Sequence, residues 1–348
     1  MTRRLPTALA AVVAIVGASL VPTIGAFASA TTSFRVSATV PSSLSATLPL
    51  LRLHFSGPAQ ASSLPPLRIT PALSVRWQQI GTHDVQAIAV GRLQPAIAYT
   101  INAPTRMSCA ASCTFLRLRR HVAMVAVSLT WEAQLLAELN YLPVRFTPNA
   151  PPTDPTQSLS GTFAWKYANL PASLSTQWHL GADNIVLRGA VMSFQSVHHL
   201  AVTGAADATT WTTLIGAVQA HDVNPGSYNY VVVSETRPQT TTLYVAGHKK
   251  FQTLANTGIP VSPTALGTYP VYLRYATTTM SGTNPDGTHY HDPGIPWVSY
   301  FNGGDALHGF IRSTYGSPQS LGCIEMPFAA AQVIYPYTPI GTLITITS

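Results

Sequence analysis

The stretch that decides the fold and chemistry of the C-terminal third is HGFIRSTYGSPQSLGCIEM, residues 308–326. It opens with a histidine followed by glycine and closes on a cysteine between glycine and isoleucine. A strand ending at His308, a loop and a return at Cys323 would bring the two side chains together. A free thiol titrates near pKa ~8.5 and imidazole near ~6.5, so a neighbouring histidine can take the proton and hold the thiolate as an ion pair. The stretch therefore predicts a nucleophile with its base.

The cysteine count supports a special role for Cys323. Cys109 and Cys113 lie in SCAASC, close enough for a local disulfide. A metal pair is the alternative, but no second pair of ligands follows at metal-binding spacing, so we predict neither a metal nor any other cofactor. Cys323 is then left over. In an exported protein an odd cysteine is an intermolecular link or a reactive thiol, and a buried structural thiol is the remaining alternative.

Export is predicted from residues 1–30, which have the pattern of a signal peptide. Arg3 and Arg4 precede the apolar run LAAVVAIVGASLV, and ASA at 28–30 offers a cleavage site. An uncleaved anchor is the alternative, because no charged residue lies between Leu5 and Thr32. We therefore expect a secreted protein that contacts the membrane only if the leader is retained.

Composition favours a folded, mainly β chain of several domains. Hydrophobic residues make up 46% of the 348 residues and charged residues 9%, with 28 prolines and 23 glycines. The formal charge of +7 falls to +5 without Arg3 and Arg4, a modest excess that suits an anionic surface such as a bacterial wall. No basic run with interleaved aromatic residues is present, so nucleic-acid binding is not expected.

Three blocks follow the leader. Residues 34–107 carry short strand-like runs such as LLRLHFSGP and SVRWQQI, which predict a β-sandwich and resemble bacterial Ig-like domains. Residues 121–222 contain three helical runs, SLTWEAQLLAELNYLP, LRGAVMSFQSVHHL and DATTWTTLIGAVQAH, the last with Asp207 as N-cap. This order resembles a three-helix peptidoglycan-binding-like module, and a helical spacer is the alternative.

The third block, residues 228–348, predicts strands throughout, including YNYVVVSE and GTLITITS. GTNPDGTHYHDPGIP, residues 282–296, is rich in Pro, Gly and polar residues, and we expect a long loop or flap there. Met280, Tyr300 and Phe301 are candidates for a substrate groove beside it.

The block's motifs resemble a known family. HGFIRSTYGSPQSLGCIEM, with NTGIPVSPTALGTYPVYLR and WVSYFNGGDALHGF upstream, resembles the catalytic domain of the YkuD-type L,D-transpeptidases. The resemblance implies that Cys323 is the nucleophile, His308 the general base and the Gly309 carbonyl the group that orients the imidazole. It also implies that Ser320 lies at the substrate site and that the oxyanion hole is made by the amides of Leu321, Gly322 and Cys323.

The implied reaction is acyl transfer between peptidoglycan stem peptides. A thioester on Cys323 forms with loss of D-Ala, an acceptor amine then resolves it, and carbapenem-type β-lactams are expected inhibitors. Two positions depart from the family pattern: Leu321 replaces a histidine and Glu325 replaces Arg or Asn. Two alternatives stay open, an L,D-carboxypeptidase using the same site and a catalytically inactive wall-binding protein.

Overall fold

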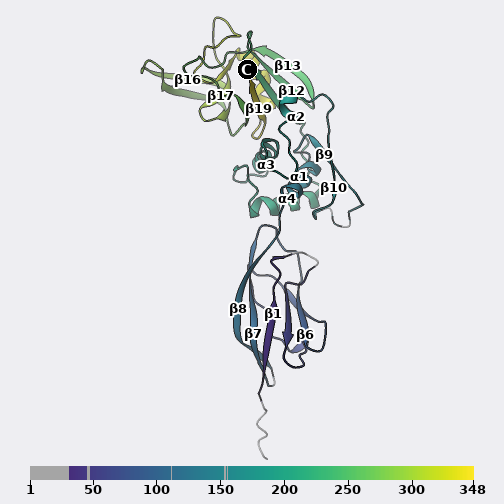
Figure 1. Cartoon of the computed structure of the whole chain (residues 1–348). Helices are drawn as coiled ribbons and strands as arrows, with labels where there is room; N and C mark the ends of the chain where they lie inside the picture. Colours follow the sequence, from purple (N-terminus) through teal and green to yellow (C-terminus); the bar gives the residue numbers. More distant parts are fainter. Residues whose placement is uncertain (1–30, 45–47, 111, 153, 155) are drawn as a thin grey trace, which may run out of the picture.

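The computed structural model describes residues 31–44, 48–110, 112–152, 154 and 156–348. The predicted leader, residues 1–30, lies outside them and stays a prediction. The expectation of a mainly β chain is confirmed, since strands hold 41% of the described residues and helices 17%. Figure 1 shows three parts following one another along the molecule. Within the described ranges, no helix has the length and apolar character needed to cross a membrane.

The first part is an eight-stranded sheet around its own core. Its strand order is β2-β8-β7-β1-β3-β6-β5, with β4 against β7. The sheet continues to Val125, beyond the predicted boundary at residue 107, because β8 pairs with β7 along almost its whole length. The strands are β1 (Thr32–Thr39), β2 (Ser43–Leu44), β3 (Leu51–Phe55), β4 (Ile69–Thr70), β5 (Val75–Gln79), β6 (Asp84–Ala89), β7 (Ala98–Cys109) and β8 (Cys113–Val125).

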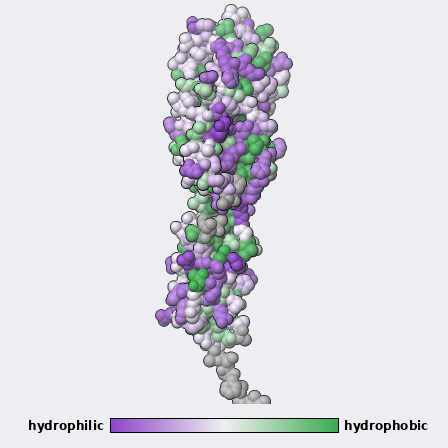
Figure 2. Space-filling model, turned by 90° about the vertical axis from the view of Figure 1, so that its right-hand side faces the viewer, coloured by the Kyte–Doolittle hydropathy of each residue, from purple (hydrophilic) through white to green (hydrophobic). Residues whose placement is uncertain are grey.

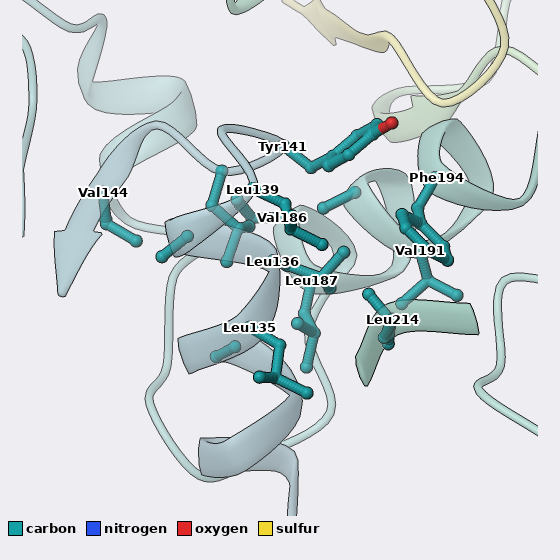
Figure 3. Close-up of a cluster of buried hydrophobic side chains, with 14 of the residues drawn as sticks. Leu135, Leu136, Leu139, Tyr141, Val144, Val186, Leu187, Val191, Phe194 and Leu214 are labelled. Carbon is teal, nitrogen blue, oxygen red and sulfur yellow. The ribbon is translucent and has the colours of Figure 1, made fainter. Parts of the chain in front are cut away.

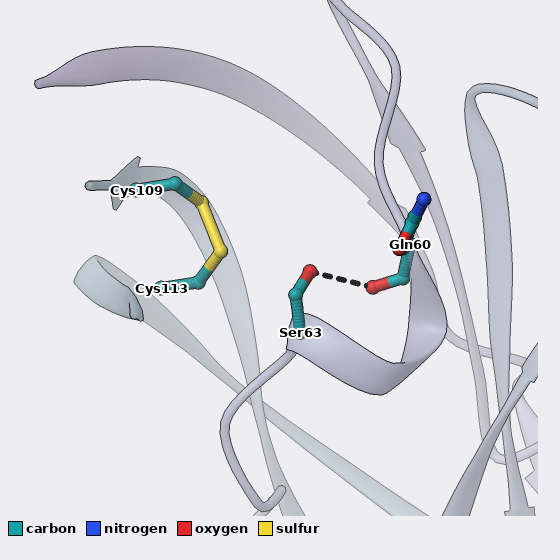
Figure 4. The surroundings of a disulfide bond; sticks show 4 residues. All are labelled: Gln60, Ser63, Cys109 and Cys113. Carbon is teal, nitrogen blue, oxygen red and sulfur yellow. Dashed lines mark hydrogen bonds between the residues drawn. A yellow bond between two sulfur atoms is a disulfide. The ribbon is translucent and has the colours of Figure 1, made fainter. Parts of the chain in front are cut away.

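Strand β1 joins the two halves of this sheet. Its first residues pair with β7, from Thr32 opposite Cys109, and its later ones pair with β3. Cys109 and Cys113 form a disulfide at the end of the β7–β8 hairpin (Figure 4). The same view shows the short helix η1 (Ala61–Ser63), where the Ser63 hydroxyl donates to the Gln60 carbonyl at 2.8 Å.

The second part contains the three predicted helical runs as α1 (Leu129–Glu138), α3 (Ile185–Val197) and α4 (Ala208–Ala220). Asp207 caps α4, since its carboxylate accepts from the Thr210 amide at 2.8 Å. The sequence did not predict the short helix α2 (Ala172–Ser175) or the hairpin of β9 (Val144–Pro148) and β10 (Gly161–Trp165).

A cluster of buried hydrophobic side chains forms the core of the second part (Figure 3). Leu135 and Leu136 of α1 meet Val191 of α3 in this cluster. The same cluster includes Tyr230 and Leu343, which belong to strands of the third part. The two parts therefore share one buried hydrophobic cluster, beside the separate core of the third part.

The third part has two sheets enclosing a core. One has the order β13-β12-β11-β19-β14 and the other β15-β16-β17-β18. Val231 of the first sheet and Leu307 of the second lie in the same buried cluster. The elements are β11 (Asn229–Ser234), β12 (Thr240–Val245), β13 (His248–Leu254), β14 (Gly267–Pro270), β15 (Leu273–Thr283), β16 (His289–Asn302), β17 (Asp305–Gly309), β18 (Ile324–Met326), α5 (Phe328–Ile334), η2 (Tyr335–Tyr337) and β19 (Leu343–Thr347).

The expectation of a long loop over residues 282–296 is wrong. β15 runs to Thr283 and β16 begins at His289, directly opposite it. The turn between them is closed by Asp286, whose carboxylate accepts from the Thr288 amide at 2.9 Å, and by Gly287 at φ +86°. Cross-strand pairing outweighs the weak strand propensity of this segment. We call the outer half of this β15–β16 hairpin, residues 278–296, the flap.

Candidate active site

Two parallel strands bring the predicted nucleophile and base to one face of a sheet. β17 and β18 pair with Leu307 opposite Ile324 and His308 opposite Glu325. Leu307 and Ile324 enter the core, so side chains alternate and His308 faces the other way. Cys323 lies two residues before Glu325, on the same face. Both Cys323 and His308 line a cavity of about 580 Å³.

His308 is held as a neutral imidazole with a defined tautomer. Its side chain is buried, and Nδ1 lies 3.0 Å from the Gly309 carbonyl oxygen. A carbonyl only accepts, so Nδ1 carries the proton and Nε2 is left as the acceptor. Burial lowers the pKa of His308 below its ordinary value. Glycine at position 309 lets the end of β17 lie against Phe328, because a Cβ there would be only 2.8 Å from the Phe328 ring.

Cys323 is a free, half-buried thiol whose pKa opposes ionisation. Its sulfur lies 3.8 Å from the Gly304 carbonyl oxygen. Burial raises the pKa of Cys323 to about 12, and the carboxylates of Asp305 and Glu325 add to the shift. The raised pKa of Cys323 and the lowered pKa of His308 both favour a neutral thiol beside a neutral imidazole over the expected thiolate–imidazolium pair in the free protein. In that state the proton moves from sulfur to imidazole as the sulfur attacks.

The loop that carries Cys323 is held in place by hydrogen bonds to its backbone carbonyls. Each of the four carbonyls from Ser320 to Cys323 accepts one hydrogen bond. The donors are Ile259 N to Ser320 O (2.9 Å), Ser262 Oγ to Leu321 O (3.0 Å), Thr264 Oγ1 to Gly322 O (2.8 Å) and Ser320 Oγ to Cys323 O (2.6 Å). Three of these donors come from NTGIPVSPTA, residues 256–265, which the sequence marked as a motif without showing its role.

Gly322 and Ser320 are hydrogen-bonded to each other inside the loop that carries Cys323. Gly322 has φ +118°, and a Cβ there would lie 2.3 Å from an Asp305 carboxylate oxygen, so only glycine fits. Its amide donates to Ser320 Oγ at 3.2 Å, which engages one of the three predicted oxyanion amides inside the loop. Ser320 is buried and lies outside the cavity lining, and its hydroxyl donates to the Cys323 carbonyl within the cysteine loop.

Of the residues predicted to line a substrate groove, some line the cavity and others lie outside it. Met280 and Leu321 line the cavity. Tyr300 is half-buried outside the lining, where it packs on neighbouring tyrosine rings. Phe301 is only 3% exposed and packs into the core against Tyr269, so its assignment to the groove is wrong. Adjacent strand residues point to opposite faces, which is why Tyr300 and Phe301 cannot share one groove.

The sequence missed the ion pair between Arg312 and Glu325. The guanidinium binds both carboxylate oxygens, Nε to Oε2 and Nη2 to Oε1, each at 2.7 Å. Nη2 also donates to the Gln319 carbonyl at 3.2 Å. Glu325 is buried and raises the pKa of Arg312. The unusual Glu325 therefore anchors the loop between His308 and Cys323 through an arginine that no local pattern marked.

Further cavity-lining residues come from the flap, from the ends of β17 and from the loop before Cys323. Asp305 has a pKa raised by burial. The sequence gave only weak signals for this group, namely a polar segment and a lone acid before the histidine. Its members are Asn284, Tyr290, Asp292, Ile295, Gly304, Asp305, Phe310 and Gln319.

Comparisons with known proteins agree with this geometry for one part of the chain. Residues 228–346 match the family model of the L,D-transpeptidase catalytic domain, YkuD. No curated protein matches the chain.

Three solved structures are similar to the chain. An L,D-transpeptidase from Mycobacterium smegmatis is 11% identical, with 90% of this chain and 99% of that one covered, at TM-score 0.32. The catalytic domain of an E. faecium L,D-transpeptidase is 24% identical, covering 35% and 99%, at TM-score 0.32. L,D-transpeptidase 3 from Mycobacterium tuberculosis is 12% identical, covering 86% and 91%, at TM-score 0.33.

The family match spans the cavity and both strands that carry Cys323 and His308. Residues 228–346 are therefore an L,D-transpeptidase catalytic domain of the YkuD family.

Proposed function

We propose that this chain is an exported cell-wall L,D-transpeptidase that cross-links peptidoglycan stem peptides through a thioester on Cys323. The observation that carries the proposal is the placement of Cys323 and His308 on one cavity, with the Nδ1 proton of His308 committed to the Gly309 carbonyl. That arrangement leaves Nε2 free to exchange a proton with the sulfur and with a departing amine.

In the first half-reaction, the sulfur attacks the carbonyl between the L-centre of a diamino acid and a terminal D-Ala. The thiol proton passes to Nε2 of His308 as the S–C bond forms. The tetrahedral intermediate then collapses, the C–N bond breaks, and His308 returns the proton to the nitrogen of the leaving D-Ala. A thioester on Cys323 remains. Because thiol and imidazole both start neutral, no buried charge has to be maintained between turnovers.

In the second half-reaction, a side-chain amine of another stem peptide attacks the thioester. His308 takes a proton from that amine, the C–S bond breaks, and the proton returns to sulfur. Carboxylates near the nucleophile suit a cationic acceptor, and Asp292 and Asp305 both lie on the cavity wall. This supports an amine acceptor over a neutral one.

Transfer requires that water reach the thioester less readily than the amine. The flap contributes Met280, Tyr290 and Ile295 to the cavity wall, so apolar and aromatic side chains cover the nucleophile from one side. This favours transfer over the L,D-carboxypeptidase alternative.

The inactive alternative depended on the departures at Leu321 and Glu325. Glu325 is matched by Arg312, and its carboxylate is fully engaged by two 2.7 Å hydrogen bonds. Leu321 lines the cavity, and its carbonyl is held by the Ser262 hydroxyl at 3.0 Å. Neither residue disturbs the Cys323–His308 arrangement, which supports an active enzyme.

Intact-mass spectrometry tests the proposal. Wild type and Cys323→Ala are incubated with a carbapenem and, separately, with a disaccharide-tetrapeptide. We expect a covalent adduct on wild type alone and release of D-Ala from the peptide. Cross-linked dimers indicate transfer, and tripeptide alone indicates hydrolysis. A folded, reduced wild type that gives neither adduct nor D-Ala would overturn the proposal. His308→Gln, expected to fold but react far more slowly, separates loss of the base from loss of the nucleophile.

A further inference from the structure

The second part has a cavity of its own, which shares no lining residue with the cavity that holds Cys323. It lies where α1, α3 and α4 begin, and its volume is about 410 Å³. On the face shown in Figure 2, hydrophobic and hydrophilic residues lie side by side in small areas. A cavity differs from such a mixed surface because it presents a ligand with a fixed set of groups, here within the helical part of the chain.

Glu132, in the first turn of α1, is buried at this cavity without a partner. The residue is only 7% exposed and lines the cavity wall. Among the residues that the structure describes, its carboxylate forms no ion pair and accepts no hydrogen bond. Burying a charged group without a partner is costly, and buried polar groups in folded proteins are nearly always satisfied. Glu138 on the same helix follows that rule, since it accepts from Gln134 Nε2 at 3.2 Å.

A second carboxylate increases the cost of the charge on Glu132. Asp183 lines the same cavity and is exposed. Burial raises the pKa of Glu132 to about 7, and the charge of Asp183 adds to the shift. Arg188 is the remaining charged residue of the lining, but in the described part of the chain it is not paired with either carboxylate. A cation bound between Glu132 and Asp183 would offset both the burial and the repulsion.

The helix ends around the cavity do not account for Glu132. Helix N-termini favour carboxylates, and three helices begin here. Each of these helices already has a capping side chain, because Ser128, Asn184 and Asp207 accept an amide hydrogen from α1, α3 and α4. A carboxylate in the first turn of a helix interacts with the helix dipole from an exposed position as well. The dipoles therefore help Glu132 to ionise, but they give no reason for its burial at a cavity.

The rest of the wall indicates which cation would fit. Leu129, Leu187 and Trp211 line the cavity beside the two carboxylates, so an aliphatic chain can pack there while a charged end meets Glu132. A divalent metal ion takes about six oxygen ligands, whereas no group of three residues that could hold a metal occurs in the described ranges. An ammonium group at the end of a methylene chain needs only one or two carboxylates.

We propose that this cavity binds the side chain of a basic diamino acid, with its primary ammonium group on Glu132 and its methylene chain against Leu129, Leu187 and Trp211. The source of that side chain is an uncross-linked peptidoglycan stem peptide, an identification that rests on the proposed function. Because cross-linking consumes the free amine, the site directs the enzyme to wall that still contains acceptors. The ammonium site itself rests on the second part alone.

Isothermal titration calorimetry with Nα-acetyl-L-lysinamide tests the site, since this probe has one ammonium group on a four-carbon chain and no carboxylate. We expect binding at pH 8 and weaker binding at pH 6, where Glu132 of the free protein is protonated. Nα-acetyl-L-norleucinamide has the same chain without the ammonium group and should bind at least about tenfold more weakly. Equal binding of the two probes, or lysinamide binding that does not change from pH 6 to pH 8, would overturn the proposal.

Matched glutamate variants locate the binding. Glu132→Gln should weaken lysinamide binding at least about tenfold, and it should raise the Tm at pH 8 because a neutral amide replaces a buried unpaired charge. Glu138→Gln, on the same helix, should bind as wild type does. Asp292→Asn should also bind the probe, which shows that the carboxylates of the catalytic cavity are not responsible. If Glu132→Gln binds normally or has a lowered Tm, Glu132 has a structural role and the proposal fails.

Stem peptides test the source of the ligand. The Cys323→Ala variant cannot form the thioester, so a failure of the proposed reaction leaves this measurement unchanged. We expect a tetrapeptide with a free diamino-acid amine to bind this variant, and the same peptide acetylated on that amine to bind at least about tenfold more weakly. Binding of lysinamide without binding of the tetrapeptide would overturn the assignment of the ligand to the cell wall.

Discussion

The first and third parts of this molecule differ in whether their charged side chains are paired. In the first part, five exposed arginines lie on three adjacent strands, and none of them forms an ion pair with a described carboxylate. In the third part, Arg312 and Glu325 are joined by two short hydrogen bonds, and the carbonyls around Cys323 each have a donor. A charge that is paired inside the fold fixes geometry, whereas a charge left unpaired at the surface stays solvated and constrains nothing around it. The predictions below test each side of this contrast.

The largest expected effect concerns the neutral state of the nucleophile. With a pKa of about 12, Cys323 should react with iodoacetamide at pH 7 about a thousandfold more slowly than a free cysteine. The sign follows from the direction of the shift: a raised thiol pKa depletes thiolate at every lower pH. The rate should therefore climb steadily from pH 6 to pH 10. A plateau beginning below pH 7, measured by peptide mass spectrometry, would instead indicate a standing thiolate–imidazolium pair.

Breaking the Arg312–Glu325 pair should have the next largest effect. Arg312→Ala leaves Glu325 buried without a partner and should lower the free energy of unfolding by about 3 kcal/mol. Glu325→Gln should cost only about 1 kcal/mol, because Arg312 is partly exposed and can turn to solvent. Urea denaturation measures both. Equal losses would show that the carboxylate is better solvated than its burial indicates.

Removing one donor from the cysteine loop should have a smaller effect. Thr264→Val leaves the Gly322 carbonyl without its hydrogen bond in a buried site, at a cost of about 2 kcal/mol. The rate of adduct formation with a carbapenem should fall as well, because the loop that carries Cys323 loses one of its four supports. Thr264→Ser retains the hydroxyl and should behave as wild type. If the serine and valine variants react equally fast, the loop is held by other contacts.

The smallest expected effect is a gain. Arg106→Glu converts two like-charge neighbours, Arg35 and Arg117, into opposite-charge pairs and should stabilise the first sheet by about 1 kcal/mol at low salt. Amide hydrogen exchange in β7 and β8 of the full chain measures this gain, which should disappear at high salt. Ser108→Glu adds one carboxylate to the same strand, two residues along, without removing an arginine, and should give less. No gain from Arg106→Glu would mean that the arginines already avoid one another in solution.

Features that depend on residues close together in the sequence could be predicted, and features that depend on residues far apart in the sequence could not. The helices of the second part were predictable because apolar spacing and an N-cap at Asp207 are local signals. Cys323 and His308 were predictable because a short loop separates two adjacent strands. The Arg312–Glu325 pair and the burial of Phe301 depend on how strands are registered and which face each residue takes, and no local pattern carries that information. The prediction of a loop over residues 282–296 was wrong for the same reason, because the pairing of this segment is set by the opposite strand.

One feature of the fold affects how this protein can be divided. Tyr230 and Leu343 belong to strands of the catalytic domain but are buried in the core of the second part, and a Cβ on Gly189 of α3 would lie 2.7 Å from the Gly341 carbonyl. The two parts thus share buried contacts, although the family match begins only at residue 228. A fragment that begins at residue 228 would expose Tyr230 and Leu343 to solvent and would lose the helices that pack against them. We therefore expect the shortest fragment that folds independently around this cavity to begin ahead of α1, at about the end of β8.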